Sequence, residues 1–156
     1  MSAVLKGAFP PLRPMAEADL EEVMAIEQVA YDFPWTLGIF RDCLKFGYHA
    51  YVCREGRELL GYGLMSVAVG ECHLLNLCVH PRHQNRGLGA HLVESMVAEA
   101  HTRGARVAFL EVRISNLAAQ HLYHKLGFHE FGIRRNYYPA RTGREDAILF
   151  IREFPA

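Results

Sequence analysis

The sequence predicts a single α/β domain built on a mixed, mostly antiparallel β-sheet. Segments of strand character and segments of helical periodicity follow one another in the order β-α-α-β-β-β-α-β-α-β-β, which gives about seven strands and four helices. The length of 156 residues suits one hydrophobic core, and 51% of the residues are hydrophobic while 22% are charged. We expect residues 1–9 to form an N-terminal extension and residues 10–156 to form the domain.

The first half of the domain is expected to hold a short strand near Leu12, two helices and three antiparallel strands. The first helix is predicted over Asp19–Val29, because apolar residues recur there at intervals of three or four. Thr36 can cap the second helix, which would run to about Leu44. The three strands are separated by turn residues and span Tyr48–Arg54, Glu58–Val67 and Cys72–Val79.

The second half alternates helices with strands. A longer helix is predicted from Gly87 to about Arg103, and a strongly apolar strand follows over Arg106–Val112. Asn116 can cap the last helix, which ends before Gly127. The closing strands are expected over Phe128–Arg134 and Ala147–Arg152, with a loop over Asn136–Arg144 between them.

Charge and composition exclude several classes of function. The 17 basic and 17 acidic residues cancel, so no overall field would attract nucleic acid. No run approaches the roughly 18 apolar residues that a membrane-spanning helix needs. Residues 1–14 lack the apolar centre of a signal peptide. We therefore expect a cytoplasmic protein, a monomer, with neither nucleic acid nor membrane as a partner.

The four cysteines and nine histidines do not indicate a metal site. The cysteines lack the Cys-x-x-Cys spacing, and the histidine pairs lack companion ligands at zinc-site spacing. Cys72 and Cys78 would share one face of a strand, too far apart to form a disulfide. Cys53 and Cys78 lie in apolar patterns and are expected to be small core residues. Reduced thiols fit the cytoplasm.

The most informative motif is an apolar strand that leads through a polar loop into a helix. It covers Val79–Ala90 and contains Gly87 and Gly89 at the expected start of the helix. Backbone N–H groups in a first helical turn have no intrahelical partners, and the helix dipole adds positive charge, so phosphate oxygens can bind there. The motif is neither a Walker loop nor the three-glycine dinucleotide fingerprint.

Two polar residues stand in apolar surroundings and are candidates for catalysis. Glu111 lies inside an apolar strand, where a carboxylate is unfavourable unless it is paired or partly wet. It can face outward, pair with Arg113, or belong to a functional site. Tyr123 lies one position from the apolar face of its helix, where it can simply be a half-buried amphipathic residue.

Together these motifs resemble the GCN5-related N-acetyltransferases. Gln84-x-x-Gly87-x-Gly89 is similar to the pyrophosphate loop of that family, and the arrangement from Asn116 through Tyr123 to Phe128 is similar to its closing motif. The resemblance covers nearly the whole chain. It implies the fold of that family, in which the third strand of the antiparallel run and the strand bearing the glutamate are parallel neighbours that splay apart at the cofactor site.

The resemblance also implies a role for each of these residues. Glu111, through water, would remove protons from the attacking amine, and Tyr123 would protonate the departing coenzyme A thiolate. Transfer would be direct, so neither an acyl-cysteine nor a metal is expected. The cosubstrate acetyl-CoA would be bound by Leu77, Cys78, Val79, Asn85, Arg86, Gly87, Leu88, Gly89, Ala90 and Asn116, although capping its own helix explains Asn116 equally well.

Two further stretches resemble one type within this family, the RimI type of ribosomal-protein-alanine N-acetyltransferases. They are residues 31–36 and the last hairpin, residues 133–139 with residues 143–147, taken together with residues 110–116. The resemblance implies that the substrate is the N-terminal alanine of the eighteenth small-subunit ribosomal protein. Trp35 and Tyr138 would contact this substrate, although Trp35 can equally serve to pack the first helix. Acidic partners for a basic substrate are available at Glu27, Asp32, Glu145 and Asp146.

Other functions remain open at this level. The acceptor amine can instead be a lysine side chain, a broader set of protein N-termini or a small amine. A non-catalytic sensor of acetyl-CoA is a further alternative, and the presence of both Glu111 and Tyr123 argues against it, since a sensor needs no acid–base pair.

Overall fold

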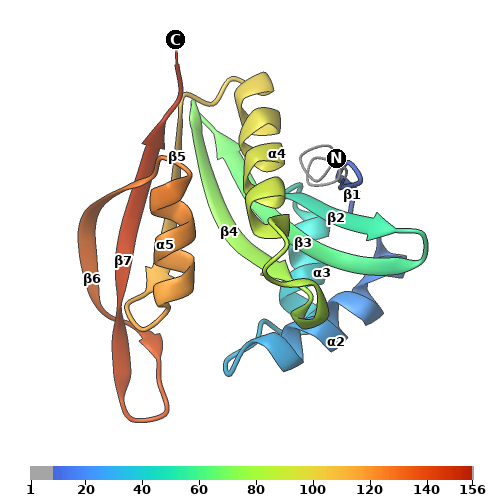
Figure 1. The fold of residues 1–156 in the computed structure, drawn as a ribbon, viewed down its shortest axis with the longest axis horizontal. Helices are drawn as coiled ribbons and strands as arrows, with labels where there is room; N and C mark the ends of the chain where they lie inside the picture. The colour runs from blue at the N-terminus through green and yellow to red at the C-terminus, as the bar shows by residue number, and fades with distance from the viewer. Residues whose placement is uncertain (1–8, 156) are drawn as a thin grey trace.

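The computed structural model describes residues 9–155, so residues 1–8 of the expected extension lie outside it. Within this range the chain forms one seven-stranded sheet in the order β1-β2-β3-β4-β5-β7-β6 (Figure 1). The strands are β1 (Arg13–Pro14), β2 (His49–Glu55), β3 (Glu58–Ala68), β4 (Glu71–Val79), β5 (Val107–Arg113), β6 (His129–Pro139) and β7 (Arg144–Glu153). The α-helices of the described range are α2 (Leu20–Ala30), α3 (Leu37–Lys45), α4 (Leu88–Thr102) and α5 (Leu117–Lys125), and the short 3₁₀ helices are η1 (Glu17–Asp19) and η2 (Pro81–His83). The predicted fold class is confirmed.

The last hairpin differs most from the prediction. The sequence predicts a loop over Asn136–Arg144, whereas β6 continues to Pro139 and pairs there with Arg144 at the start of β7. Asn136 has a positive φ of 52° at a bulge, where the Asp146 carboxylate accepts its backbone N–H at 2.9 Å. Turn-forming residues are thus absorbed into a bulged hairpin, because a side chain satisfies the backbone group that the irregular ladder leaves free.

Helices cover both faces of the sheet around its centre. α4 and α5 contribute Met96 and Tyr123 to a buried cluster on one face. α2 and α3 contribute Val23 and Phe40 to a second cluster on the other face. Each helix buries mainly the stripe of residues that recurs every three or four positions, and its charged residues lie outside this stripe except for Glu27 of α2, which is buried. None of the helices in residues 9–155 is long and apolar enough to cross a membrane.

A β-bulge in β4 changes which face its side chains occupy. The register with β3 shifts where Leu75 is inserted, between the partners Leu74 and Asn76. Cys72, before the bulge, belongs to the cluster under α4 and α5, whereas Cys78, after it, belongs to the cluster under α2 and α3. The expectation that these two cysteines share a face is therefore wrong. One extra residue reverses the alternation of side chains that a regular strand would keep.

β4 and β5 are parallel neighbours that separate along their length. Their pairing is limited to Glu71–His73 opposite Val107–Phe109. Beyond these residues the two strands diverge, and Figure 1 shows α5 on one side of the gap and α4 on the other. The helix α4 makes the crossover connection that parallel strands require. The predicted splayed pair is confirmed.

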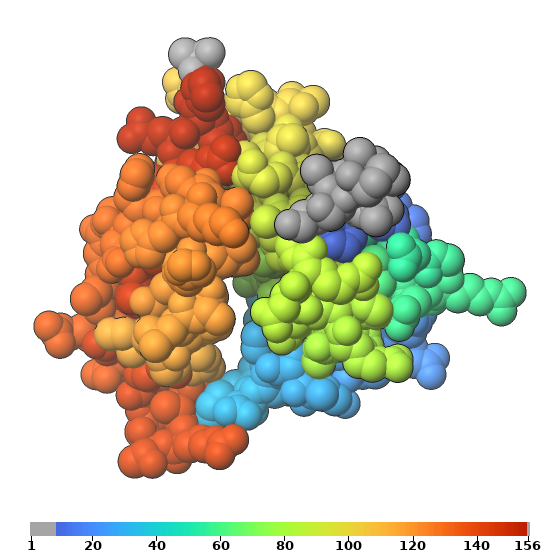
Figure 2. Space-filling view, in the orientation of Figure 1, coloured from blue at the N-terminus to red at the C-terminus, as the bar shows by residue number. Residues whose placement is uncertain are grey.

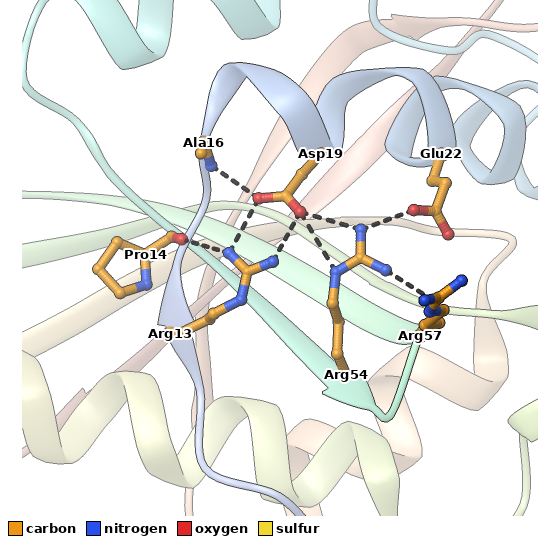
Figure 3. A network of polar contacts seen from close by, with 7 residues as sticks. All are labelled: Arg13, Pro14, Ala16, Asp19, Glu22, Arg54 and Arg57. Carbon is orange, nitrogen blue, oxygen red and sulfur yellow. Dashed lines mark hydrogen bonds and ion pairs between the residues drawn. The ribbon is translucent and has the colours of Figure 1, made fainter.

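A polar network fastens the first elements to the edge of the sheet (Figure 3). Asp19 is only 3% exposed, and its carboxylate accepts hydrogen bonds from Arg13 at 2.8 Å, Arg54 at 2.9 Å and the Ala16 N–H at 2.8 Å. Burial raises the pKa of Asp19, and these hydrogen bonds lower it further than burial raises it, to about 2. Arg54 also pairs with Glu22 of α2 at 2.7 Å. The network therefore links β1, α2 and β2.

Candidate active site

A cavity of about 790 Å³ lies where β4 and β5 diverge. Residues from both faces of the sheet line it, including Phe33 and Trp35, which follow α2, and Asn116 and Ala119, at the cap and in the first turn of α5. In Figure 2 the opening lies between orange α5 and the yellow-green loop that precedes α4. At one end the light-blue connection between α2 and α3 meets the β6–β7 hairpin. The cavity therefore passes between the strands and offers an approach from each face.

The loop between β4 and α4 has the geometry of an anion site. Gly87 is the N-cap residue of α4 and has a φ of 84°, which glycine adopts without strain. The His91 N–H donates to the Gly87 carbonyl at 3.1 Å, so the N–H groups of Leu88, Gly89 and Ala90 precede the first bond of the helix. The first turn of α4 carries no acidic residue. These N–H groups are available as donors to phosphate oxygens.

Other residues of the loop contribute to its shape. A Cβ added at Gly89 would lie 3.3 Å from Leu122 Cδ2, so this glycine allows α4 to approach α5 closely. Asn85 has a positive φ of 63°. The Arg86 guanidinium donates to His83 Nδ1 at 2.9 Å and lies 5.6 Å from the centre of the Phe9 ring. Contacts of these residues with a cofactor stay a prediction.

Alternate residues of β4 direct their backbone polar groups toward the cavity. The His80 N–H bonds to β3 at 2.8 Å, and hydrogen-bonded pairs alternate along an antiparallel ladder. Cys78 therefore turns its N–H and C=O toward β3, while Leu77 and Val79 turn theirs toward the gap. The Leu77 carbonyl accepts the Tyr31 hydroxyl at 2.6 Å, as this alternation requires.

Cys78 itself has no polar group directed to the cavity. Its side chain packs in the cluster under α2 and α3, and burial raises the pKa of its thiol to about 11. The thiol is therefore protonated at neutral pH and is a poor nucleophile. Of the three contacts expected on this strand, Leu77 and Val79 remain in our proposal as backbone donors, and Cys78 does not.

Glu111 projects from β5 with both carboxylate oxygens in contact. Its Oε2 lies 2.7 Å from His73 Nε2, and its Oε1 accepts a hydrogen bond of 3.4 Å from the Tyr137 hydroxyl. Arg113 pairs instead with Glu145 at 2.8 Å, so the alternative of a Glu111–Arg113 pair is wrong. Burial raises the pKa of Glu111, but the contacts with His73 and Tyr137 bring it below its ordinary value. Glu111 is therefore ionised at neutral pH.

Tyr123 lies in the wall that α5 contributes to the cavity. It packs against the rings of Phe128 and Phe150, with centroids 5.6 and 6.1 Å away. Burial raises the pKa of Tyr123 to about 12, so the hydroxyl keeps its proton at neutral pH. Asn116 caps α5 by accepting the Ala119 N–H at 3.1 Å. The cap accounts for the side-chain oxygen of Asn116, and its contact with a cofactor stays a prediction.

Arg113 joins the two segments that face each other at the entrance. Its guanidinium lies 4.5 Å from the centre of the Tyr138 ring and 5.2 Å from that of Phe33. A second link crosses the same entrance, where Arg141 lies 3.3 Å from Asp32. These two contacts bring the segments together across the entrance, and Tyr138 lines the cavity there.

Trp35 both lines the cavity and packs against the first helices. Its ring lies 5.3 Å from that of Phe40, and its backbone N–H donates to Glu27 at 2.9 Å. Glu27 is 1% exposed and also accepts the Tyr62 hydroxyl at 2.8 Å and the Asn76 amide at 3.3 Å. The two interpretations of Trp35 are thus compatible, because the packed ring still forms part of the wall.

The sequence did not predict the contacts of three residues that help to form the site: His73, Tyr31 and Arg113. A polar residue between two apolar ones on a strand, as at His73, is a weak signal. Its contact with Glu111 depends on the parallel register of β4 and β5, which places His73 opposite Phe109. Such long-range register is not visible in the spacing of residues along the chain.

Comparison with known proteins identifies the family to which this chain belongs. The sequence profile of the acetyltransferase (GNAT) family matches residues 16–128. The chain therefore belongs to the GNAT family of acetyltransferases, whose members use acetyl-CoA.

Individual relatives place the chain more narrowly. It is 40% identical over 131 residues to the ribosomal protein bS18-alanine N-acetyltransferase of Escherichia coli strain K12, which covers 84% of this chain and 88% of that protein. The protein of the same name from Salmonella typhimurium is 40% identical over 135 residues, covering 86% and 91%. A crystal structure of the Escherichia coli ribosomal-protein-S18-alanine N-acetyltransferase superposes with a TM-score of 0.86 and 36% identity, covering 93% and 94%.

Proposed function

We propose that this protein transfers an acetyl group from acetyl-CoA to the N-terminal alanine of ribosomal protein bS18. One observation carries the proposal: Glu111 and Tyr123 line a single cavity between the splayed strands. The cavity holds a carboxylate that is ionised and a phenol that is protonated at neutral pH. The relatives named for this activity, at 40% identity over 84% of the chain, support the choice of substrate.

Each side chain has a part in the transfer. Glu111, directly or through water, accepts the proton that the nitrogen loses as its lone pair bonds to the thioester carbonyl carbon. The N–H groups of Leu77 and Val79 stabilise the negative charge that develops on the carbonyl oxygen. Tyr123 donates its proton to the sulfur as the C–S bond breaks. The N–H groups of Leu88 to Ala90 bind the pyrophosphate.

An N-terminal amine suits a carboxylate whose pKa lies below its ordinary value. The pKa of an α-amine is about 7.7–8.0, so roughly a quarter of it is neutral near pH 7.4, against about a thousandth of a lysine amine. Glu111 then has to remove a proton only once the nitrogen has begun to bond and has become acidic. A lysine would require a stronger base or a desolvated amine.

The proposed substrate is basic, and one acidic residue at the entrance is exposed enough to meet it. Glu27 is buried, Glu145 binds Arg113, and Asp146 holds a backbone N–H. Asp32 has a side chain that is 63% exposed and only a 3.3 Å contact with Arg141. Asp32→Asn should raise the KM for the peptide about threefold at low salt and less at high salt, as peptide titrations at two ionic strengths would show.

Mass spectrometry of peptide acetylation tests the proposal. The purified protein is incubated with acetyl-CoA and a short basic peptide that begins with a free alanine. A matched peptide with a blocked N-terminus and free lysines serves as the control. We expect acetylation of the free alanine alone. Acetylation of the blocked peptide would assign the protein to lysine substrates, and binding of acetyl-CoA with no acetylation of either peptide would refute the substrate proposed here.

A further inference from the structure

We propose that His73 is a positioning residue that orients Glu111 for proton transfer, an inference that rests on the proposed function. His73 Nε2 lies 2.7 Å from Glu111 Oε2. Its side chain is 40% exposed, whereas that of Glu111 is 15% exposed. Glu111 lines the cavity and His73 does not, so His73 acts on the substrate only through the carboxylate.

The fold places His73 at the point where the strands begin to separate. His73 and Phe109 form the last pair of the short parallel ladder between β4 and β5. Cys72 and Ala108, the preceding residues, are both buried under α4 and α5. Because side chains alternate along a strand, His73 and Glu111 project together from the opposite face. The contact between them therefore spans the two strands that bound the cavity.

The contact leaves one carboxylate oxygen for chemistry. An ionised carboxylate only accepts hydrogen bonds, so His73 Nε2 carries the hydrogen that it donates to Oε2. The other oxygen, Oε1, has only the longer 3.4 Å contact with the Tyr137 hydroxyl. Rotation of the carboxylate would exchange the two oxygens, and the bond from His73 prevents it. Oε1 is thereby held as the atom that accepts the proton.

The charged and titratable groups around Glu111 come from two strands. His73 approaches from β4, while Arg134, Tyr137 and Tyr138 approach from β6. Among these groups His73 makes the shortest contact with the carboxylate. Loss of His73 is therefore expected to free the carboxylate and to raise the pKa of Glu111, because a hydrogen bond to the ionised form is lost.

A double-mutant cycle on peptide acetylation tests the inference. His73→Ala should lower kcat about tenfold and leave the KM for acetyl-CoA within twofold of the wild type, because the side chain lies outside the cavity. His73→Gln, which can still donate to the carboxylate, should recover most of the lost rate. In a Glu111→Gln background, His73→Ala should have no further effect, since both changes act on one group. The exposed His129 of β6 provides the matched control, and His129→Ala should leave kcat unchanged.

Three kinetic results would overturn the inference: an unchanged or higher kcat in His73→Ala, equal losses in His73→Ala and His73→Gln, or a full additional loss in the Glu111→Gln background. An NMR titration of the Glu111 carboxyl group separates this inference from the proposed function. If the wild type does not acetylate the alanine peptide, the proposed function fails. A higher Glu111 pKa in His73→Ala would still support the contact, and an unchanged pKa would refute it.

Discussion

Two carboxylates in this protein, Asp19 and Glu111, are largely removed from water and yet have pKa values below the ordinary range. They differ in how many of their oxygen lone pairs are used. Asp19 accepts from two arginines and a backbone N–H, all within 3.2 Å. Glu111 has one short contact, with His73, and faces a cavity. A saturated carboxylate stabilises a fold, and an unsaturated one that is held ionised is available for chemistry.

The two halves of the sheet differ in a similar way, because one is covered by helices and the other keeps side chains exposed. The half that holds Asp19 packs α2 and α3 over one of its faces and α4 over the other. In the half that holds Glu111, the edge strand β6 keeps Phe131 and Tyr137 exposed at 52% and 37%. The first half, packed on both faces, holds its strands in place, and the second half leaves room for a substrate beside Glu111, the proposed base.

The largest expected effect is on catalysis, from Glu111→Gln. The amide fills the same space but cannot accept the amine proton, so kcat/KM for the alanine peptide should fall about a thousandfold. The free energy of unfolding should change by less than about 1 kcal/mol, since the Glu111 carboxylate accepts only one short hydrogen bond. Steady-state kinetics and urea unfolding measure the two effects. A loss of less than tenfold would show that Glu111 is not the base.

Asp19→Ala should lower stability and leave activity almost unchanged, the opposite of Glu111→Gln. Removing the carboxylate leaves Arg13 and the half-buried Arg54 without their shared partner, which should lower the free energy of unfolding by about 3 kcal/mol. The kcat/KM of the folded fraction should stay within twofold of the wild type, because the network lies outside the cavity. Urea unfolding followed by circular dichroism, with activity measured well below the midpoint, would detect both. A large loss of kcat/KM with no loss of stability would contradict the conclusion that Asp19 stabilises the fold and takes no part in catalysis.

The pH dependence of stability should reveal the ionisation of Asp19. Its folded pKa of about 2 lies below the ordinary value of 3.8, so its stabilisation is present above pH 4 and is lost as pH falls toward 2. The shift corresponds to about 2 kcal/mol. The wild type should lose this amount between pH 5 and pH 2 relative to Asp19→Asn, as urea unfolding at several pH values would show. Equal slopes in the two proteins would contradict the network as the cause.

The pH dependence of activity should follow the ionisation of the substrate amine and not that of Glu111 or Tyr123. Glu111 is ionised and Tyr123, with a pKa of about 12, is protonated across the neutral range. The value of kcat/KM should therefore follow the α-amine and rise roughly sixfold from pH 7 to pH 8.5, with no decline below about pH 10. Initial rates in buffers of constant ionic strength give this profile. A descending limb near pH 8 would exclude Tyr123 as the acid in the state described here.

Much of the site was predictable because its elements are local. The strand, loop and helix around Gly87 are contiguous, and the positive φ of that residue follows from the short connection. The caps at Thr36 and Asn116 are also local, and both accept the backbone N–H three residues on. Glu111 and Tyr123 were visible because a polar residue in apolar surroundings is conspicuous in any sequence.

What remained hidden was set by register between distant segments. The bulge at Leu75 places Cys72 and Cys78 on opposite faces of the sheet, and no feature of the sequence of residues 72–78 predicts it. The long hairpin of β6 and β7 depends on Asp146 satisfying a backbone group ten residues away. Each of these outcomes is decided by the hydrogen bonds that a strand finds in its neighbour, and spacing along one strand does not contain that information.

The sequence by itself determined the order of elements and the family, and it singled out Glu111 and Tyr123 as candidates for catalysis, because periodicity, capping and contiguous motifs are properties of neighbouring residues. Only the tertiary structure decided which groups meet. It paired Glu111 with His73 rather than Arg113 and brought the Tyr31 hydroxyl to the Leu77 carbonyl. The reason is geometric: two parallel strands that pair for three residues and then diverge fix both the contacts at their junction and the cavity beyond it.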